Sequence, residues 1–446
     1  MPGLCPSRVP ARESGGLVMD SILALGLLFT TASQLRLQGI PVGPGELGLL
    51  VWITGMVFKT LVSGEPSLTR AASALLAFWG AFALALSLGM ITAMATGEAF
   101  EPGLVLHDVM AYVMAAAVSC FCAATPSRLR RVGWLLVISG AVSVSLQYVN
   151  GIGLFRIPGI DPWYWERFRG WSDNPNQLSF LCLMIVLLAW YLADTATSLG
   201  SRLAAILSMI PPLVAGRMSQ SDTFMLALAA ALPVWIAVKL IVCVHNDRLG
   251  VSLRASIARL GLVAAPVLLL CVAPLVLSRA GDVKGFVIGF AKNAGAEAAD
   301  EANLRMTLWR QAIERGFESG MLGLGPGPHM EIPPSILAGR VSEAQPANLD
   351  HPSQNGTANF EAHNTVLDVF TQGGFLAVAS FVWLLLRATK CVYRAQSAGL
   401  MALVAGAAIF MMTGNIVRQP IFWFAIALCL TAQIARSEPR RPARPT

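Results

Sequence analysis

Apolar runs long enough to span a bilayer recur along nearly the whole of this 446-residue chain. A helix of about 20 apolar residues crosses the ~30 Å hydrocarbon core, and a soluble domain rarely needs even one such segment. Hydrophobic residues make up 55% of the chain and charged residues only 13%, which is about half the charged share of a soluble domain. The runs therefore predict an all-α polytopic membrane protein rather than two or three soluble domains.

The runs number about twelve, the first being too long for the apolar part of a cleaved signal peptide. The expected spans are residues 17–36, 46–63, 70–95, 104–124, 132–150, 174–194, 202–216, 221–243, 260–278, 363–386, 397–414 and 419–436.

Basic residues gather in alternate connections, and this bias sets the expected orientation. Arg128, Arg130 and Arg131 lie in one connection of the richer set, and the C-terminal tail of that set is also rich in arginine. Both termini are therefore expected in the cytoplasm. The formal net charge of +7 indicates no nucleic-acid partner, because the basic residues lie between helices and form no basic stripe with interleaved aromatics.

One long polar interval interrupts the spans. The chain thus divides into nine spans over residues 1–278, a large outer loop over 279–362, three spans over 363–436 and a disordered cytoplasmic tail over 437–446. A polar loop of this length on a helical scaffold is uncommon unless it carries function.

Short structured pieces are expected inside the large loop. Acidic residues at 300 and 301 precede a helical pattern that Gly320 closes. Arg305 and Trp309 would share one face of that helix, being four residues apart. The run Gly323-Leu324-Gly325-Pro326-Gly327-Pro328 predicts a tight, stiff turn.

The first candidate site is the outer connection that carries Arg167 and Arg169 among tryptophans. A guanidinium is the preferred partner of a phosphate, because its fork donates two parallel charge-assisted hydrogen bonds. Structural alternatives stay open: the tryptophans suit the headgroup level, the arginines suit snorkelling, and Asn174-Pro175-Asn176 suits a helix start.

The second candidate is Arg217, in a tight outer turn near the hydrocarbon, where a charge is costly and tends to be functional. It follows Pro211-Pro212, which should bend or break the span at 202–216. A broken helix often lies beside a cavity, and a plain proline kink is the equal alternative.

The third candidate is His363, at the mouth of the helix that follows the large loop, with Asn364 directly after it. An imidazole titrates near neutrality and suits a general base. Thr371-Gln372-Gly373-Gly374 should interrupt this helix about two turns later. His329 and His351 lie in the same loop, but the two spacings between the three histidines, 22 and 12 residues, match no common zinc pattern, so we expect no metal.

At these residues the chain resembles the O-antigen ligase and polymerase superfamily of bacterial inner-membrane proteins. The likeness covers roughly residues 163–374. Three features carry it, in the same order and on the same side of the membrane: Arg169-Gly170 leading to Asn174-Pro175-Asn176, Arg305 and Trp309 followed by the glycine-rich turn, and Ala362-His363-Asn364 followed by Leu367 and Gly373-Gly374.

The resemblance implies a GT-C-like, metal-independent glycosyltransferase of the inner membrane that needs no cofactor. Its large loop would be periplasmic, its donor a glycan on undecaprenyl diphosphate, and its acceptor lipid A–core or a growing polysaccharide.

By position, the resemblance assigns the diphosphate to Arg167, Arg169 and Arg217, and the acceptor proton to His363. Asn176, Arg305 and Asn364 would support them. Where the family often has a basic residue after serine, this chain has Ser221-Asp222-Thr223, so Arg217 would have to supply that charge.

Ligase and polymerase both stay open, with the glycine- and proline-rich turn slightly favouring an exopolysaccharide polymerase. The alternative from another class is a transporter or flippase for a lipid-linked glycan. Paired broken helices in two related halves would favour it.

Overall fold

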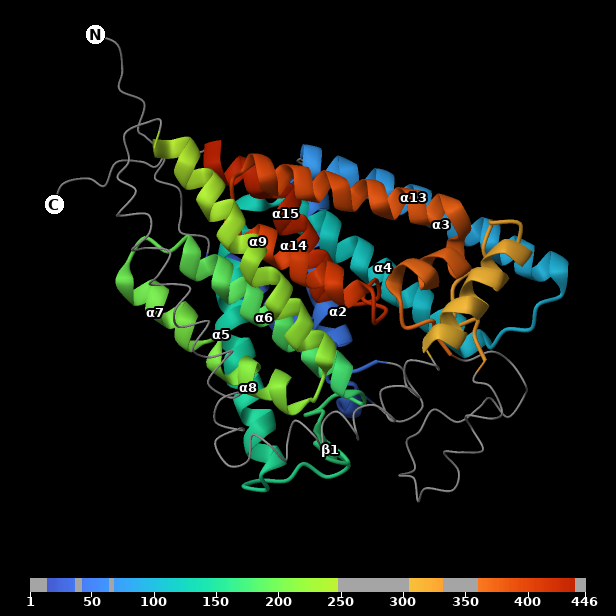
Figure 1. Cartoon of the computed structure of the whole chain (residues 1–446), viewed down its shortest axis with the longest axis horizontal. Helices are drawn as coiled ribbons and strands as arrows, with labels where there is room; N and C mark the ends of the chain where they lie inside the picture. The colour runs from blue at the N-terminus through green and yellow to red at the C-terminus, as the bar shows by residue number, and fades with distance from the viewer. Residues whose placement is uncertain (1–13, 37–41, 64–67, 248–304, 332–359, 438–446) are drawn as a thin grey trace, which may run out of the picture.

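The computed structural model describes residues 14–36, 42–63, 68–247, 305–331 and 360–437, and these are mostly helical (Figure 1). The helices are α1 (Ser14–Phe29), α2 (Pro44–Ser63), α3 (Arg70–Thr96), α4 (Pro102–Ala124), α5 (Pro126–Gly151), α6 (Pro175–Asp194), α7 (Leu199–Leu207), α8 (Ile210–Met218), α9 (Asp222–Asp247), α13 (Thr365–Arg394), α14 (Ala398–Met411) and α15 (Pro420–Ser437). Residues 305–318 are also helical, and a 3-10 turn, η1 (Ser33–Leu35), follows α1.

Among the described residues, eight helical segments are long and apolar enough to cross a membrane, with α7 and α8 counted as one. The shorter apolar helices are α1, α14 and α15. The expectation of a multi-pass helical membrane protein is confirmed to this extent. The span expected at 260–278 lies outside the described residues.

The first helix is shorter than the apolar run predicted. It ends at Phe29, because the hydroxyl groups of Thr30 and Thr31 donate to the carbonyl oxygens of Leu27 and Leu28 at 3.0 and 2.8 Å. Such side-chain bonds compete with helix continuation. In the other direction, α13 runs on to Arg394, beyond the expected residue 386.

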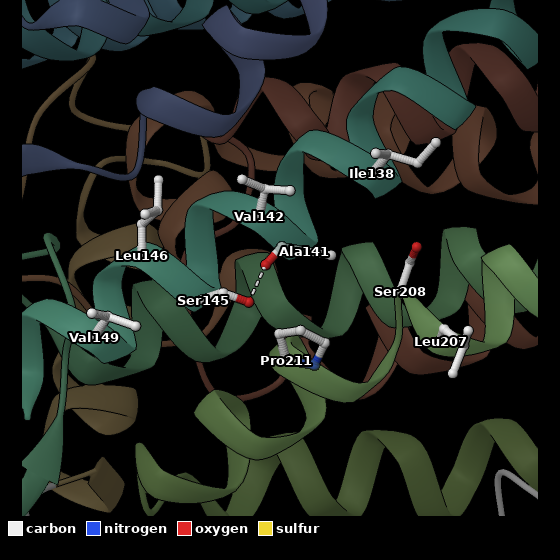
Figure 2. A pocket seen from close by; sticks show the side chains of 9 residues that line it. All are labelled: Ile138, Ala141, Val142, Ser145, Leu146, Val149, Leu207, Ser208 and Pro211. Carbon is white, nitrogen blue, oxygen red and sulfur yellow. Dashed lines mark hydrogen bonds between the residues drawn. The ribbon is translucent and has the colours of Figure 1, made fainter.

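The two prolines break a helix, as the sequence predicted. α7 ends at Leu207, and α8 begins at Ile210 with Pro211 and Pro212 in its first turn, where the missing N–H groups cost least. An open groove of about 380 Å³ lies at this break, between α5 and α7–α8 (Figure 2). Its lining is Ile138, Ala141, Val142, Ser145, Leu146, Val149, Leu207, Ser208 and Pro211, so none of the predicted site residues lines it.

The core is built around α6, whose side chains are buried along nearly its whole length. A helix that is apolar all round belongs in the middle of a bundle. α14 packs antiparallel against it: the Phe180 and Phe410 rings lie 5.0 Å apart, and Gly399 approaches the backbone of Tyr191. Glycine allows that approach, since a Cβ at position 399 would lie 2.6 Å from the Tyr191 Cα.

Successive helices alternate in direction, so the connections fall at two ends of the bundle. We name one the hairpin end. It carries the short antiparallel hairpin of β1 (Trp163–Tyr164) and β2 (Arg167–Phe168), together with the starts of α6, α9, α13 and α15. α13 and α3 lie side by side along the top of Figure 1, with residues 305–318 beside the ends that meet there.

Candidate functional site

The hairpin holds Arg167 against two other elements. Its strands pair Trp163 with Phe168 and Tyr164 with Arg167. The Arg167 Nε donates to the Ser219 carbonyl oxygen at 3.0 Å, and its Nη2 donates to the Asn176 Oδ1 at 3.1 Å. Arg167 thus joins the hairpin to the start of α6 and to the turn between α8 and α9, and its side chain is half-buried.

The start of α6 is capped as its sequence suggests. The Asn174 Oδ1 accepts from the Asn176 backbone N–H at 2.8 Å, with Pro175 at the first helical position. The capping alternative for Asn174 is therefore confirmed. The Asn176 side chain is left to bond Arg167.

Arg169 turns into the protein. It is only 3% exposed, and its guanidinium donates to the Asp161 carbonyl oxygen at 2.9 Å, to the Asp161 Oδ2 at 3.2 Å and to the Asp173 carbonyl oxygen at 3.3 Å. The Tyr164 ring lies under it at 5.5 Å. Arg169 therefore holds the connection around the hairpin, and it does not snorkel towards headgroups.

Arg217 lies in the last turn of α8 and is exposed. The turn that follows is fixed by Ser219, whose Oγ donates to the Gly216 carbonyl oxygen at 2.7 Å, and by Gln220, which adopts a positive φ of 52°. Since Arg167 bonds Ser219, the structure places Arg167, Arg217 and Asn176 in one corner of the hairpin end.

His363 precedes α13 in a strained backbone conformation, with φ at +51°. A non-glycine residue there costs on the order of 1 kcal/mol and persists only where its surroundings impose it. Here the Asp368 Oδ1 accepts from the Ala362 N–H at 2.7 Å, and the Asn364 Oδ1 caps α13 by accepting from the Val366 and Leu367 N–H groups. These bonds fix the turn that presents the half-buried imidazole beside the Phe360 ring, 5.5 Å away.

The connection between α14 and α15 is hydrogen-bonded to the residues that follow His363. Asn364 donates to the Met412 carbonyl oxygen at 3.4 Å, and the Thr365 Oγ1 donates to the Gly414 carbonyl oxygen at 2.6 Å. The Ile416 N–H donates back to the Thr365 Oγ1 at 3.2 Å. The start of α13 is thereby tied to the end of α14.

This tie brings the two groups of candidates to one end of the molecule. Met412 follows α14 directly, and Phe410 of α14 packs against Phe180 of α6. Asn176 lies one turn before Phe180. One helical turn is about 5.4 Å. His363 and the Arg167 corner therefore lie at the same end of the α6–α14 pair.

The helix 305–318 and the glycine-rich turn form one unit with α13. Leu308, Ala312, Met330 and Ala362 make a small buried cluster, with Trp309 against it. The predicted end of this helix is confirmed, since Gly320 follows it with φ at +65°. Arg305 lies one turn before Trp309 and is half-buried.

The glycine-rich turn fills an interruption in α13. Gly374 has φ +61° and ψ −158°, which breaks the helix where the sequence predicted. The Leu324 and Gly325 N–H groups donate to the Thr371 and Gln372 carbonyl oxygens at 2.7 and 2.8 Å, and the Phe375 N–H donates to the Met321 carbonyl oxygen at 2.9 Å. The stiff turn is confirmed, with positive φ at Gly323, Gly325 and Gly327.

A chain of ion pairs that the sequence did not single out lies next to His363. Arg418 pairs through Nη1 with Asp108 and through Nη2 with Glu361, two residues before His363. Asp108 is 1% exposed and also meets the His107 Nδ1 at 3.3 Å. An acidic residue within an apolar helix was the available signal, because such groups are almost always paired.

We expect Arg418→Met to destabilise the protein by about 3 kcal/mol, because it leaves the buried Asp108 carboxylate without its partner. Adding Asp108→Asn should recover much of the loss. Thermal unfolding in detergent measures both. The control is Arg310→Met. The ion pair of Arg310 with Glu314 is exposed, so its loss should leave the unfolding temperature nearly unchanged. Equal stability of Arg418→Met and wild type would contradict the prediction.

His329 makes stability depend on pH. Burial lowers the pKa of its imidazole below the ordinary 6.5, and its Nε2 donates to the Gly325 carbonyl oxygen at 2.8 Å. Below about pH 6.5 the His329 imidazole binds a proton in the unfolded chain but stays neutral in the folded protein. Stability should therefore fall as pH falls from about 6.5. In the His329→Asn variant, the unfolding temperature should no longer fall as pH falls from about 6.5. Parallel pH profiles of the unfolding temperature for the variant and the wild type would contradict this prediction.

The described helices include two interrupted ones with different surroundings. The break between α7 and α8 opens on the apolar groove, whereas the break in α13 at Gly374 is filled by the glycine-rich turn. Among the described helices, these two breaks do not form the matched pair that would favour the transporter alternative.

Comparison with known proteins agrees with the motifs. Residues 187–382 match the family model described as O-antigen ligase. Comparison with curated proteins and with solved structures found no match. The matched segment contains Arg217, Arg305 and His363, whereas Arg167 and Arg169 precede it. The match implies a glycosyl-transferring enzyme of ligase or polymerase type. It confirms that this multi-pass membrane protein resembles the O-antigen ligase and polymerase superfamily.

Proposed function

We propose that the protein transfers a glycan from undecaprenyl diphosphate to a lipid A–core or polysaccharide acceptor at the periplasmic face of the bacterial inner membrane. The observation that carries the proposal is the turn at His363. Several hydrogen bonds hold its backbone at a positive φ, and the turn lies at the same end of the bundle as the Arg167 corner. The O-antigen ligase match over residues 187–382 supports the reaction class.

The chemistry needs one base and several positive charges. The acceptor hydroxyl attacks the anomeric carbon, its proton passes to the His363 imidazole, and the bond between that carbon and the diphosphate oxygen breaks with its electrons on the diphosphate. The diphosphate leaving group is already negatively charged. Guanidinium groups that stabilise this charge therefore take the place of a strong general acid. Attack opposite the diphosphate inverts the anomeric centre.

The guanidinium roles differ. Arg217 is exposed in its corner and is our first candidate for the diphosphate. Arg167 has one nitrogen on Asn176 and one on the Ser219 carbonyl oxygen, so it can both shape the corner and add charge. Arg169 acts through the connection that it holds, since Asp161 and Asp173 already accept from its guanidinium.

The experiment uses a deletion strain complemented with variants, with surface polysaccharide separated on gels. Arg217→Ala should restore little glycan, since removing one donor to a developing charge costs about 10²–10³ in rate. Arg217→Lys should restore part of it, because it keeps the charge but loses the fork. Arg310→Ala, an exposed arginine on the helix 305–318, is the control and should restore fully. Full restoration by Arg217→Ala would remove Arg217 from the site.

The same strain separates the two reactions. A ligase deletion leaves lipid-linked polymer to accumulate and removes all long glycan from lipid A–core. A polymerase deletion leaves single repeat units or removes a secreted polymer.

A further inference from the structure

The helix 305–318 has three faces, although a helix on a protein surface needs only two. At 100° per residue, Leu308, Ala312 and Ser319 fall on one side, and all three are buried. Glu314 and Glu318 fall on another side, and both are exposed. The exposed Arg310 lies at the border of that side, about 20° from Phe317, where a long arginine side chain can reach the headgroups.

The third face is apolar and uncovered among the described residues. Met306, Ile313 and Phe317 lie within about 40° of each other, since they are spaced by seven and four residues. Their exposed fractions are 62%, 43% and 61%. We name these three residues the 306–317 stripe. Three large apolar side chains on one line, beside a polar face, are not the scatter of a water-facing surface.

The stripe continues onto the lipid-facing surface of α13. The Phe317 ring meets the Phe370 ring edge-on at 5.8 Å, and Gly316 lies against the same ring. Beyond Phe370, α13 exposes Phe375 at 67%. Because α13 is long and apolar enough to span the membrane, an exposed phenylalanine on it faces hydrocarbon.

Ion pairs hold the helix in this orientation. Arg315 pairs with Glu98, which follows α3, and with Glu331 at 3.8 Å, beyond the glycine-rich turn. The helix is thus fastened to the segment after α3 and to the segment after the glycine-rich turn, and the stripe cannot rotate inwards without breaking those ion pairs.

We propose that the helix 305–318 is an interfacial helix whose 306–317 stripe inserts into the outer boundary of the bilayer that the other helices span. Its buried face packs on the protein, its stripe contacts acyl chains, and its charged face meets water and headgroups. The partner is the lipid surface. The glycine-rich turn and the His363 turn, packed against the same helix, are thereby set at the depth of the headgroups.

Photocrosslinking in lipid nanodiscs tests the assignment. p-Benzoylphenylalanine replaces Ile313 in one variant of the full chain and Met306 in a second. Glu314, 53% exposed but on the charged face, is the matched negative control, and Leu84, exposed in the middle of α3, is the positive control. Adducts are identified by mass spectrometry, and elution in detergent checks that each variant folds.

Phospholipid adducts should form at positions 313 and 306 in several-fold higher yield than at 314. Adducts to peptides of this chain, such as residues 248–304 or 332–359, would show that protein covers the stripe and would overturn the proposal. Equal lipid yields at 313 and 314, or no lipid adduct at 313 and 306 while 84 gives one, would overturn it as well. Using two stripe positions keeps the test decisive if one variant fails to fold.

Discussion

Replacing His363 with asparagine is expected to abolish surface glycan in the complemented deletion strain while leaving the protein folded. A positioned general base contributes about 10²–10⁴ in rate, and asparagine has no group that titrates near neutrality. Asparagine tolerates positive φ, so it can occupy the +51° backbone of this position. Loss of glycan would then reflect the imidazole rather than the turn.

His363→Gly should also abolish surface glycan. Glycine adopts positive φ without strain, so this variant removes the imidazole and keeps the turn. The control is Gln396→Asn, because Gln396 also has φ at +51° but lies between α13 and α14 at the opposite end of the bundle. Immunoblots of membranes check protein amounts. Normal polysaccharide with either His363 variant would rule out His363 as the base.

Replacing Gly374 with alanine is expected to destabilise the protein by about 3 kcal/mol or more. Its φ of +61° and ψ of −158° belong to a region that only glycine enters freely, and entry by another residue alone costs about 1–3 kcal/mol. An added Cβ would also lie 2.6 Å from the Leu322 carbonyl carbon. The glycine-rich turn would have to move, and with it the bonds from Leu324 and Gly325.

The matched control for Gly374→Ala is Gly80→Ala. A Cβ at Gly80, within α3, meets nothing within 4 Å, so alanine should stabilise its helix by about 0.5–1 kcal/mol. Thermal unfolding in detergent compares the two variants. Similar unfolding temperatures of the two variants would mean that the hydrogen bonds between the glycine-rich turn and α13 contribute little to stability.

Local signals predicted much of this fold. Apolar runs located the described spans, although α1 ends seven residues before its expected end and α13 ends eight residues beyond it. Pro211-Pro212 located the break between α7 and α8, and Gly373-Gly374 located the break in α13. Each signal acts through the backbone of the residues that carry it. The helix caps Asn174 and Asn364 are of the same kind.

Partners distant in sequence were not predictable in this way. Arg418 and Asp108 are 310 positions apart, and neither has a neighbour in sequence that identifies the other. The orientation of Arg169 is a similar case. Its residue type favours a phosphate partner, but only the folded connection shows that Asp161 and Asp173 accept from it. Residue type indicates what a side chain can bind, and tertiary packing decides what it reaches.

The interruption in α13 has a consequence for biogenesis. The Thr371 and Gln372 carbonyl oxygens accept from Leu324 and Gly325. Both residues are buried, so their carbonyl groups are costly to leave without a hydrogen-bond donor. Synthesis from the N-terminus delivers the glycine-rich turn before α13 emerges, so the donors can be in place when the start of that helix settles at the membrane boundary. Deleting residues 321–327 should therefore impair insertion of α13 into the membrane, not only the shape of the finished enzyme.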